Sequence, residues 1–499
     1  MRFYFFIFSF LVLSCSNKPT VELPITTSSE KAFGYYKKAM DSFEVGDDFE
    51  TRLFLDSALV QDSIFVLALE FHGSPDPIIR KQYQDRAKSL SKNVTEAERK
   101  ILSIRESYRN GDMDQALEDA NWLVSNHGDS YQSFVWLGMV QSDRRELQSA
   151  IVSLKKAIEL NPDCYDAYNL LMGHHIAAGL QQMLPEDQRD VTLGLEYGDE
   201  LIRIRSDHGY PYHFKANCYR QIGDFEKAKP LYEKSIAKRK GLSSEGTANL
   251  VSGHNYMFSG DFTNARERYT RAINLARTNN GWFQLNYYLT ISHIFENNYL
   301  GAIDNINKVE RMMIEKKFDD ITRLEREANI NWQKMLCYAH NQMEDEAFLS
   351  MNNVISLNKK RAGLLQNEYI SSTIESEEQY LKAWVNILFG KYDQSRENLQ
   401  TLKLYQEKRN DPTAMHGYYG LLGMVNLMEG NYDLALSNFD NGDETNIYFN
   451  YFKGLTLKAS RKEVNARKIF SELANINFSS WEIAIIRNLA NKQLEKITI

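Results

Sequence analysis

The sequence predicts an all-α fold, a stack of antiparallel helix pairs, and three observations favour it. Small residues recur twelve and then seven positions apart, most clearly at Gly138, Ala150 and Ala157. Two antiparallel helices cross closely where both carry small side chains, which is the role we expect for Gly138 and Ala150. The expected turns between helices often carry a glycine, a polar residue and an aromatic residue. Only 9 of the 499 residues are proline, and 12% are aromatic, so the chain favours helices with large side chains to bury.

The same spacing of small residues returns along most of the chain. The closest copies are Ala216, Ala228 and Ser235; Gly253, Ala265 and Ala272; and Gly423, Ala435 and Gly442. Looser copies, with a larger residue at some places, begin at Ile104, Thr290, Met335, Ala383 and Gly454. The glycines of the turns, such as Gly223 and Gly260, tolerate the left-handed conformation that ends a helix.

This spacing resembles the tetratricopeptide repeat, a unit of about 34 residues whose helix pairs stack into a superhelix. The resemblance implies a right-handed superhelical solenoid of about eleven such pairs over residues 31–480. Residues 481–499 are expected to form a C-terminal capping helix, because Ser479 and Ser480 can cap it and Trp481, Ile485 and Ile486 share one face.

Several segments depart from the repeat period. Asp76 followed by Pro77 predicts an additional helix that begins there and lies between the first and second units. Longer connections are expected at residues 179–194, 312–326 and 359–378. In repeat arrays such insertions form loops or lengthen helices on one face, which is often the binding face.

Residues 1–14 resemble the signal peptide of a bacterial lipoprotein. Arg2 precedes an apolar run from Phe3 to Leu13, which is shorter than the ~20 helical residues that cross a membrane. Ser14 stands directly before Cys15, so the resemblance implies a mature chain that begins at a lipid-modified Cys15. An ordinary signal peptide with an incidental cysteine is the alternative. Residues 15–30 hold two prolines and a Thr-Thr-Ser-Ser run, which predicts a flexible tether.

Charge and motifs argue against nucleic-acid binding and catalysis. The net charge is −7, whereas phosphate binding depends on accumulated positive charge. The sequence has no His-Glu-x-x-His, no Gly-x-Ser-x-Gly, no phosphate-binding loop and no paired-cysteine spacing. His174 and His175 are adjacent, so on a helix they would point about 100° apart and share no ligand face. We therefore predict a protein that is not an enzyme and that holds no cofactor and no metal.

The repeat register selects candidate ligand residues. The resemblance places a concave groove at first-helix positions three before, one after and six before the small residue. The candidates selected in this way are Tyr210, His213, Asn217, Tyr287, Trp332, Tyr380, Trp384, Tyr448 and Tyr451, with the apolar Ile291, Leu336 and Leu455 beside them. Aromatic side chains offer large contact areas with a polar handle, which suits peptide or glycan surfaces. The alternative is that they pack in the core.

The leading prediction is a non-catalytic, lipid-anchored scaffold of the cell envelope that binds a protein or peptide of unknown identity. It would reach the membrane through its lipid anchor only, at the outer membrane, and would face the periplasm or the cell exterior. One alternative is a lipoprotein that captures glycans with the same aromatic residues. Another is a sensory or regulatory module, because residues 95–178 resemble repeat regions that accompany bacterial signalling domains.

Overall fold

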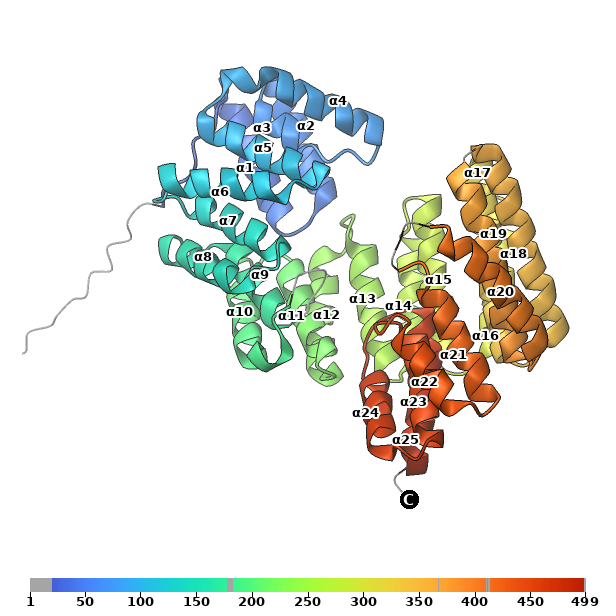
Figure 1. Ribbon diagram of the computed structural model, residues 1–499. Coiled ribbons are helices and arrows are strands. Elements are labelled where there is room, and N and C mark those ends of the chain that lie inside the picture. Colours follow the sequence, from blue (N-terminus) through green and yellow to red (C-terminus); the bar gives the residue numbers. More distant parts are fainter. Residues whose placement is uncertain (1–19, 177–182, 367, 410, 412, 498–499) are drawn as a thin grey trace, which may run out of the picture. The chain divides into compact units, whose positions relative to one another are not determined.

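A computed structural model describes residues 20–176, 183–366, 368–409, 411 and 413–497. The predicted signal peptide and the lipid acceptor Cys15 lie outside the described residues. The chain divides into two compact units, Met1–Cys218 (unit 1) and Tyr219–Ile499 (unit 2), and both are built from α-helices (Figure 1).

Unit 1 contains the first eleven α-helices, the last of which runs three residues past the boundary. They are α1 (Glu30–Glu44), α2 (Asp48–Gln61), α3 (Val66–Phe71), α4 (Pro77–Leu90), α5 (Glu96–Asn110), α6 (Met113–Asn126), α7 (Tyr131–Asp143), α8 (Leu147–Leu160), α9 (Tyr165–His175), α10 (Val191–Ile204) and α11 (Tyr210–Gln221). The additional helix predicted at Pro77 is α4, and the Asp76 side chain accepts hydrogen bonds from the main-chain N–H groups of Ile78 and Ile79. This prediction is confirmed.

Unit 2 contains the other fourteen α-helices of the described residues. They are α12 (Phe225–Arg239), α13 (Glu245–Phe258), α14 (Phe262–Asn274), α15 (Asn279–Phe295), α16 (Tyr299–Met313), α17 (Asp320–His340), α18 (Glu344–Leu365), α19 (Glu368–Leu388), α20 (Tyr392–Glu407), α21 (His416–Met428), α22 (Tyr432–Asp440), α23 (Ile447–Ala459), α24 (Glu463–Ala474) and α25 (Trp481–Ile497). The insertions expected after residues 312 and 359 lengthen α17, α18 and α19 to 21, 22 and 21 residues.

Within the described residues the helices form eleven consecutive pairs along the chain. The first pair is α1 and α2, the others run from α5 and α6 to α23 and α24, and α3 and α4 are inserted after the first pair. The predicted all-α solenoid of about eleven helix pairs is therefore confirmed.

A large side chain of the second helix fills the space above the small residue of the first. A Cβ added at Gly138 would lie 2.7 Å from the side chain of Leu154, and Ala150 and Ala157 are fully buried. The same offset of sixteen residues brings Tyr269 onto Gly253, Phe439 onto Gly423 and Phe470 onto Gly454. The glycine of each of these pairs thus accommodates a specific Leu, Tyr or Phe.

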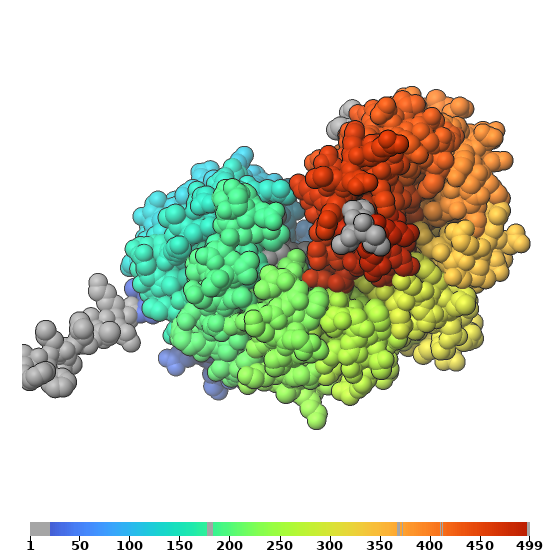
Figure 2. Space-filling model, turned by 90° about the horizontal axis from the view of Figure 1, so that it is seen from below, coloured from blue at the N-terminus to red at the C-terminus, as the bar shows by residue number. Residues whose placement is uncertain are grey.

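The last helix of unit 2 packs back on the first helices of the same unit. The Asn488 side chain donates a 2.8 Å hydrogen bond to the Phe295 carbonyl, and the Arg487 guanidinium donates one of 3.3 Å to the Phe258 carbonyl. Figure 2 shows this red end of the chain beside the yellow-green helices of unit 2. Ile483, Ile485 and Ile486 are buried, so α25 covers part of the inner side of unit 2, where the predicted groove lies.

The segment before α1 differs from the predicted flexible tether in its described part. Residues 21–29, which we call the strap, pack on unit 1. Leu23 is buried, and Thr26 and Thr27 donate hydrogen bonds to the carboxylates of Glu98 and Asp62. The tether prediction is therefore wrong for these residues, because the hydroxyl groups that suggested a linker act as hydrogen-bond donors to side chains distant in sequence.

Candidate functional site

The three predicted groove residues of α11 do not line an open groove. His213 and Asn217 are buried, and Tyr210 packs against a cluster that includes Val45 and Tyr165. This cluster brings the residues that follow α1 against the start of α11: a Cβ added at Gly46 would lie 4.0 Å from the Tyr210 ring. The prediction that these side chains are available to a ligand is corrected.

Three of the six predicted aromatic residues of unit 2 also lie in its core. Trp384, Tyr448 and Tyr451 are 4%, 3% and 5% exposed. The Trp481 ring of α25 lies 5.9 Å from the Trp384 ring and 5.5 Å from the Tyr448 ring, so α25 covers them. Tyr451 packs on Phe470 at 5.8 Å. The groove prediction is corrected for these three residues.

The remaining candidates fall into three groups. Ile291 and Leu336 are buried in the core, and Leu455 packs against it. Tyr380 is partly exposed and borders a cavity of about 70 Å³ together with Trp332 and Trp384. Of these candidates, only Tyr287 and Trp332 line a space among the described residues that is large enough for a ligand.

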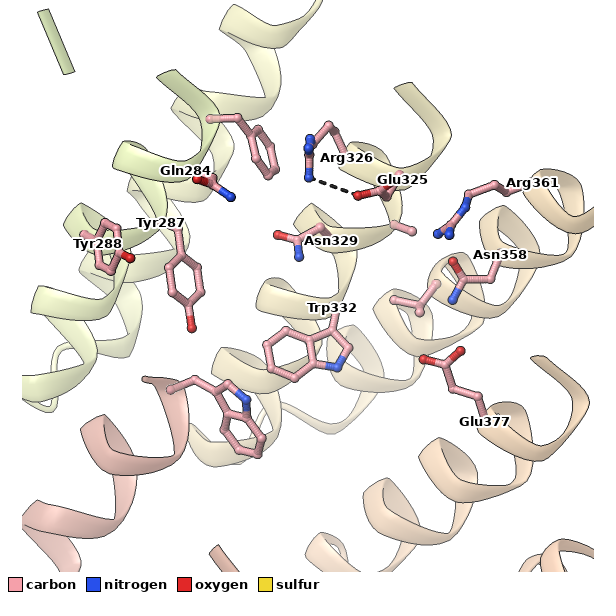
Figure 3. A pocket seen from close by; sticks show the side chains of 14 residues that line it. Gln284, Tyr287, Tyr288, Glu325, Arg326, Asn329, Trp332, Asn358, Arg361 and Glu377 are labelled. Atoms are coloured by element: carbon pink, nitrogen blue, oxygen red, sulfur yellow. Dashed lines mark hydrogen bonds and ion pairs between the residues drawn. The ribbon is translucent and has the colours of Figure 1, made fainter. Parts of the chain in front are cut away.

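That space is a pocket of about 570 Å³ in unit 2, shown in Figure 3. Its walls come from five helices: α15, α17, α18, α19 and α25. The lining residues are Phe283, Gln284, Tyr287, Tyr288, Glu325, Arg326, Ala328, Asn329, Trp332, Val354, Asn358, Arg361, Glu377 and Trp481. Natural ligand pockets have volumes of roughly 300 to 1,000 Å³, so this one has the size of a binding site.

One side of the pocket is aromatic. The rings of Trp332 and Trp481 meet edge to face with centroids 5.3 Å apart. The Tyr287 hydroxyl lies within hydrogen-bonding reach of the Trp481 main-chain N–H at the start of α25, and burial raises the pKa of Tyr287 above its usual range. This contact links α15 to α25 beside the aromatic side of the pocket.

The opposite side of the pocket is polar, and contacts with other described residues use only part of its hydrogen-bonding capacity. Arg326 binds Glu325 at 3.1 Å and the Asn280 side-chain oxygen at 3.3 Å. Arg361 projects into the pocket from α18 (Figure 3) and forms no hydrogen bond or ion pair with another described residue. Burial raises the pKa of Glu377, and the positive charge of Arg361 opposes that shift. The pocket therefore offers hydrogen-bonding groups that a ligand can use.

The arrangement supports noncovalent binding. The Asn358 and Gln284 amides also form no hydrogen bond within the described residues, and each presents a donor and an acceptor. Among the residues that the structure describes, no group of three or more His, Cys, Asp or Glu side chains is placed to hold a metal ion. The site combines planar polar groups with aromatic rings.

The repeat register missed the polar residues of the pocket. Glu325, Arg361 and Glu377 lie in the two segments where the repeat period is interrupted, at residues 312–326 and 359–378. Those insertions add turns to α17, α18 and α19, and the added turns extend past the ordinary repeat and form the polar wall. The signal that could have identified these residues is the insertion, because insertions often mark a binding face.

No helix within the described ranges combines the length and the apolar character needed to cross a membrane.

Comparison with known proteins identifies the repeats. The helix pairs and their glycine-centred crossings define a helical-repeat protein. The tetratricopeptide repeat family matches residues 131–164 and 210–237, which hold α7 with α8 and α11 with most of α12. The chain thus contains tetratricopeptide repeats. No curated protein sequence matches it.

Two solved structures show similarity at low identity. A tetratricopeptide repeat protein from Parabacteroides merdae is 11% identical, with 60% of this chain and 98% of that chain covered and a TM-score of 0.32. Yeast Tom70 is also 11% identical, with 94% of this chain and 95% of that chain covered and a TM-score of 0.32.

Proposed function

We propose that this protein is a non-catalytic, lipid-anchored scaffold of the cell envelope that holds a segment of a partner protein in the pocket of unit 2. Tetratricopeptide repeats support a role as a protein-interaction scaffold. The observation that carries the proposal is that Tyr287 and Trp332, both selected by the repeat register, line one pocket with Gln284, Asn358 and Arg361, whose side chains form no hydrogen bond with another described residue.

The pocket suits a peptide segment. An apolar side chain of the partner would pack against Trp332 and Trp481, where aromatic area is concentrated. The Asn358 and Gln284 amides would pair with main-chain N–H and C=O groups, because an amide side chain has the same donor and acceptor as a peptide bond.

The anchor in this proposal is a lipid on Cys15. The protein would then be held at the outer membrane and would face the periplasm or the cell exterior. The support is the short apolar run that precedes Ser14 and Cys15. No nucleic acid is expected as a partner, since the net charge is −7.

The pocket also favours a second candidate, the capture of a glycan. A sugar ring can stack on the face of an indole such as Trp332, and its hydroxyl groups can pair with the amide, guanidinium and carboxylate groups of Asn358, Arg361 and Glu377. The two candidates use the same residues and differ only in the ligand.

Binding of the full-length protein to a random peptide library and to a glycan array tests both candidates. Asn358→Ala removes a pocket amide, and Asn352→Ala on the same helix is the matched control, because Asn352 is exposed and outside the pocket. We expect the library to contain peptides that bind the wild type and Asn352→Ala with similar affinity. The same peptides should bind Asn358→Ala and Trp332→Ala about tenfold more weakly. Binding only to glycans, with the same pattern among variants, would favour the second candidate. Ligands that bind all four proteins equally would refute the pocket as the site.

The anchor has its own test. A thiol at Cys15 is the lipid acceptor in this proposal, so Cys15→Ser is expected to leave the membrane fraction or to retain an uncleaved leader. Mass spectrometry of the mature N-terminus would identify the lipid. Full retention of Cys15→Ser in the detergent-extractable membrane fraction would contradict lipid anchoring.

A further inference from the structure

The strap is attached to unit 1 along its length. The Leu23 main-chain N–H donates a 2.6 Å hydrogen bond to the Gln132 side chain, and Val21 pairs with Ser130 in a parallel β-bridge. Ser29 then caps α1, since its side chain accepts a hydrogen bond from the Ala32 N–H. The strap therefore runs from the N-terminal end of α7 to the N-terminal end of α1.

Two acidic side chains of unit 1 depend on the strap. Glu98 is fully buried, and its carboxylate accepts hydrogen bonds from the Thr26 N–H at 2.8 Å and from the Thr26 hydroxyl at 2.5 Å. Asp62 accepts hydrogen bonds from the Thr27 hydroxyl at 2.6 Å and from the Ser28 N–H at 3.1 Å. Burial tends to raise the pKa of Asp62, but these hydrogen bonds outweigh it and lower the pKa. Release of the strap would leave buried carboxylates without these partners, which is costly.

Because the strap is attached to unit 1, a lipid on Cys15 would hold unit 1 closer to the membrane than a free tether would. The inference rests on the lipid-modified Cys15 of the proposed function. Between Cys15 and Val21 the chain can span roughly 20 Å when fully extended, at ~3.3–3.6 Å per residue. The headgroup layer itself takes up roughly 5–7 Å of this length. The tether of residues 15–30 predicted from the sequence would have allowed roughly 50 Å.

We propose that the strap holds unit 1 against the membrane surface, with the edge around Val21, Ser130 and the start of α7 facing the lipid headgroups. Chain length and the strap contacts impose this position, so it does not require a basic surface. The partner of this edge is the headgroup layer of the membrane that carries the anchor.

Energy transfer from the protein to labelled lipid measures the position. The lipidated full-length protein is placed in phosphatidylethanolamine and phosphatidylglycerol vesicles that contain a rhodamine-labelled lipid. A donor dye is attached at Asp129→Cys, next to Ser130, or at Ile78→Cys on α4, on the other side of unit 1 (Figure 1). Cys164, Cys218 and Cys337 are buried, so the introduced thiol is the accessible one. We expect transfer several-fold stronger from position 129 than from position 78.

Two further variants separate the strap from other causes. A Gly-Ser insertion of about twenty residues between Lys18 and Pro19 leaves every strap contact in place but lengthens the reach, so it should abolish the difference between the two labels. Replacement of Thr26 and Thr27 by Val, which has a similar shape but no hydroxyl, should reduce the difference in energy transfer between the two labels. Equal transfer from both labels, or a difference that the insertion leaves unchanged, would overturn this inference alone. A wild-type protein that does not float with the vesicles would overturn the lipid anchor and this inference together.

Discussion

The indole N–H of Trp384 donates a 3.2 Å hydrogen bond to the hydroxyl of Tyr448, 64 positions further along the chain. Trp384 lies on α19 and Tyr448 on α23, so the bond crosses from one helix pair to another on the inner side of unit 2. The Trp481 ring packs against both. Aromatic residues that the repeat register assigned to a groove thus form a core with a satisfied polar pair.

Trp384→Ala is expected to destabilise unit 2. The side chain is buried, and truncation of a buried aromatic residue usually costs ~3–5 kcal/mol. Trp384→Phe should cost less, because it keeps an aromatic ring and loses mainly the hydrogen bond to Tyr448. Urea unfolding followed by circular dichroism measures both. Trp332→Ala is the comparison, since Trp332 is only partly buried. A Trp384→Ala protein as stable as Trp332→Ala would show that this inner side is not a core.

The sequence predicted the helix pairs because the crossing of two helices depends on local residues. Gly138 and Leu154 are sixteen positions apart, and their contact repeats wherever that offset repeats. The packing of α25 on the inner side of unit 2 could not be predicted in this way. The apolar face of α25, with Ile485 and Ile486, is the same whether the helix caps the end of the array or packs back on α15, and periodicity does not say which surface it meets.

The strap and the polar wall of the pocket also depend on features that the repeat pattern does not predict. Thr26 and Thr27 have the composition of a linker, and only the buried carboxylates of Glu98 and Asp62, distant in sequence, make them part of the fold. The pocket was partly predictable, because the repeat register selected Tyr287 and Trp332. The positions of its charged residues depend on how far the inserted turns extend α17, α18 and α19, which a repeat pattern does not determine.

Ala150→Leu is expected to disrupt unit 1 locally. Ala150 is fully buried, and overpacking of a core usually costs ~1–3 kcal/mol. Repeats contact mainly their neighbours, so hydrogen exchange should accelerate in α7 to α10 and stay unchanged in α21 to α24. Val152→Leu on the same helix is the control, since Val152 is 70% exposed. Uniform acceleration across both units would contradict a stack of repeats.

His340 is expected to make unit 2 less stable in acid. It lies among the rings of Tyr299, Trp384 and Tyr448, and burial lowers its pKa to about 4. Between this value and the ordinary pKa of about 6.5, the unfolded chain binds a proton that the folded chain does not. The free energy of unfolding should therefore fall as the pH drops through this window, by at most ~1.4 kcal/mol per pH unit from this group.

His340→Phe tests the contribution of the imidazole, because it keeps a ring in the same place. Denaturant unfolding of the two proteins between about pH 4 and pH 7 should show a shallower acid loss for His340→Phe. Burial also lowers the pKa of His254, but that group is present in both proteins, so the difference between them isolates His340. Parallel pH profiles would exclude a contribution from His340.

Glu44 and Asp166 are expected to give unit 1 the opposite pH dependence. Burial and the neighbouring Asp166 carboxylate raise the pKa of Glu44, although Arg205, 3.5 Å away, opposes the shift, and burial raises the pKa of Asp166. The folded protein thus keeps protons that the unfolded chain has already released. The contribution of these two carboxyl groups to the free energy of unfolding is therefore fully present below the ordinary carboxyl pKa and is lost as the pH rises through the raised values.

Hydrogen exchange in α1 and α9 should be faster at about pH 8 than at about pH 6, after correction for the intrinsic rate. Glu44→Gln should remove most of this difference, whereas Glu30→Gln, exposed on the same helix, should keep it. Equal corrected rates at both pH values in the wild type would refute a retained proton.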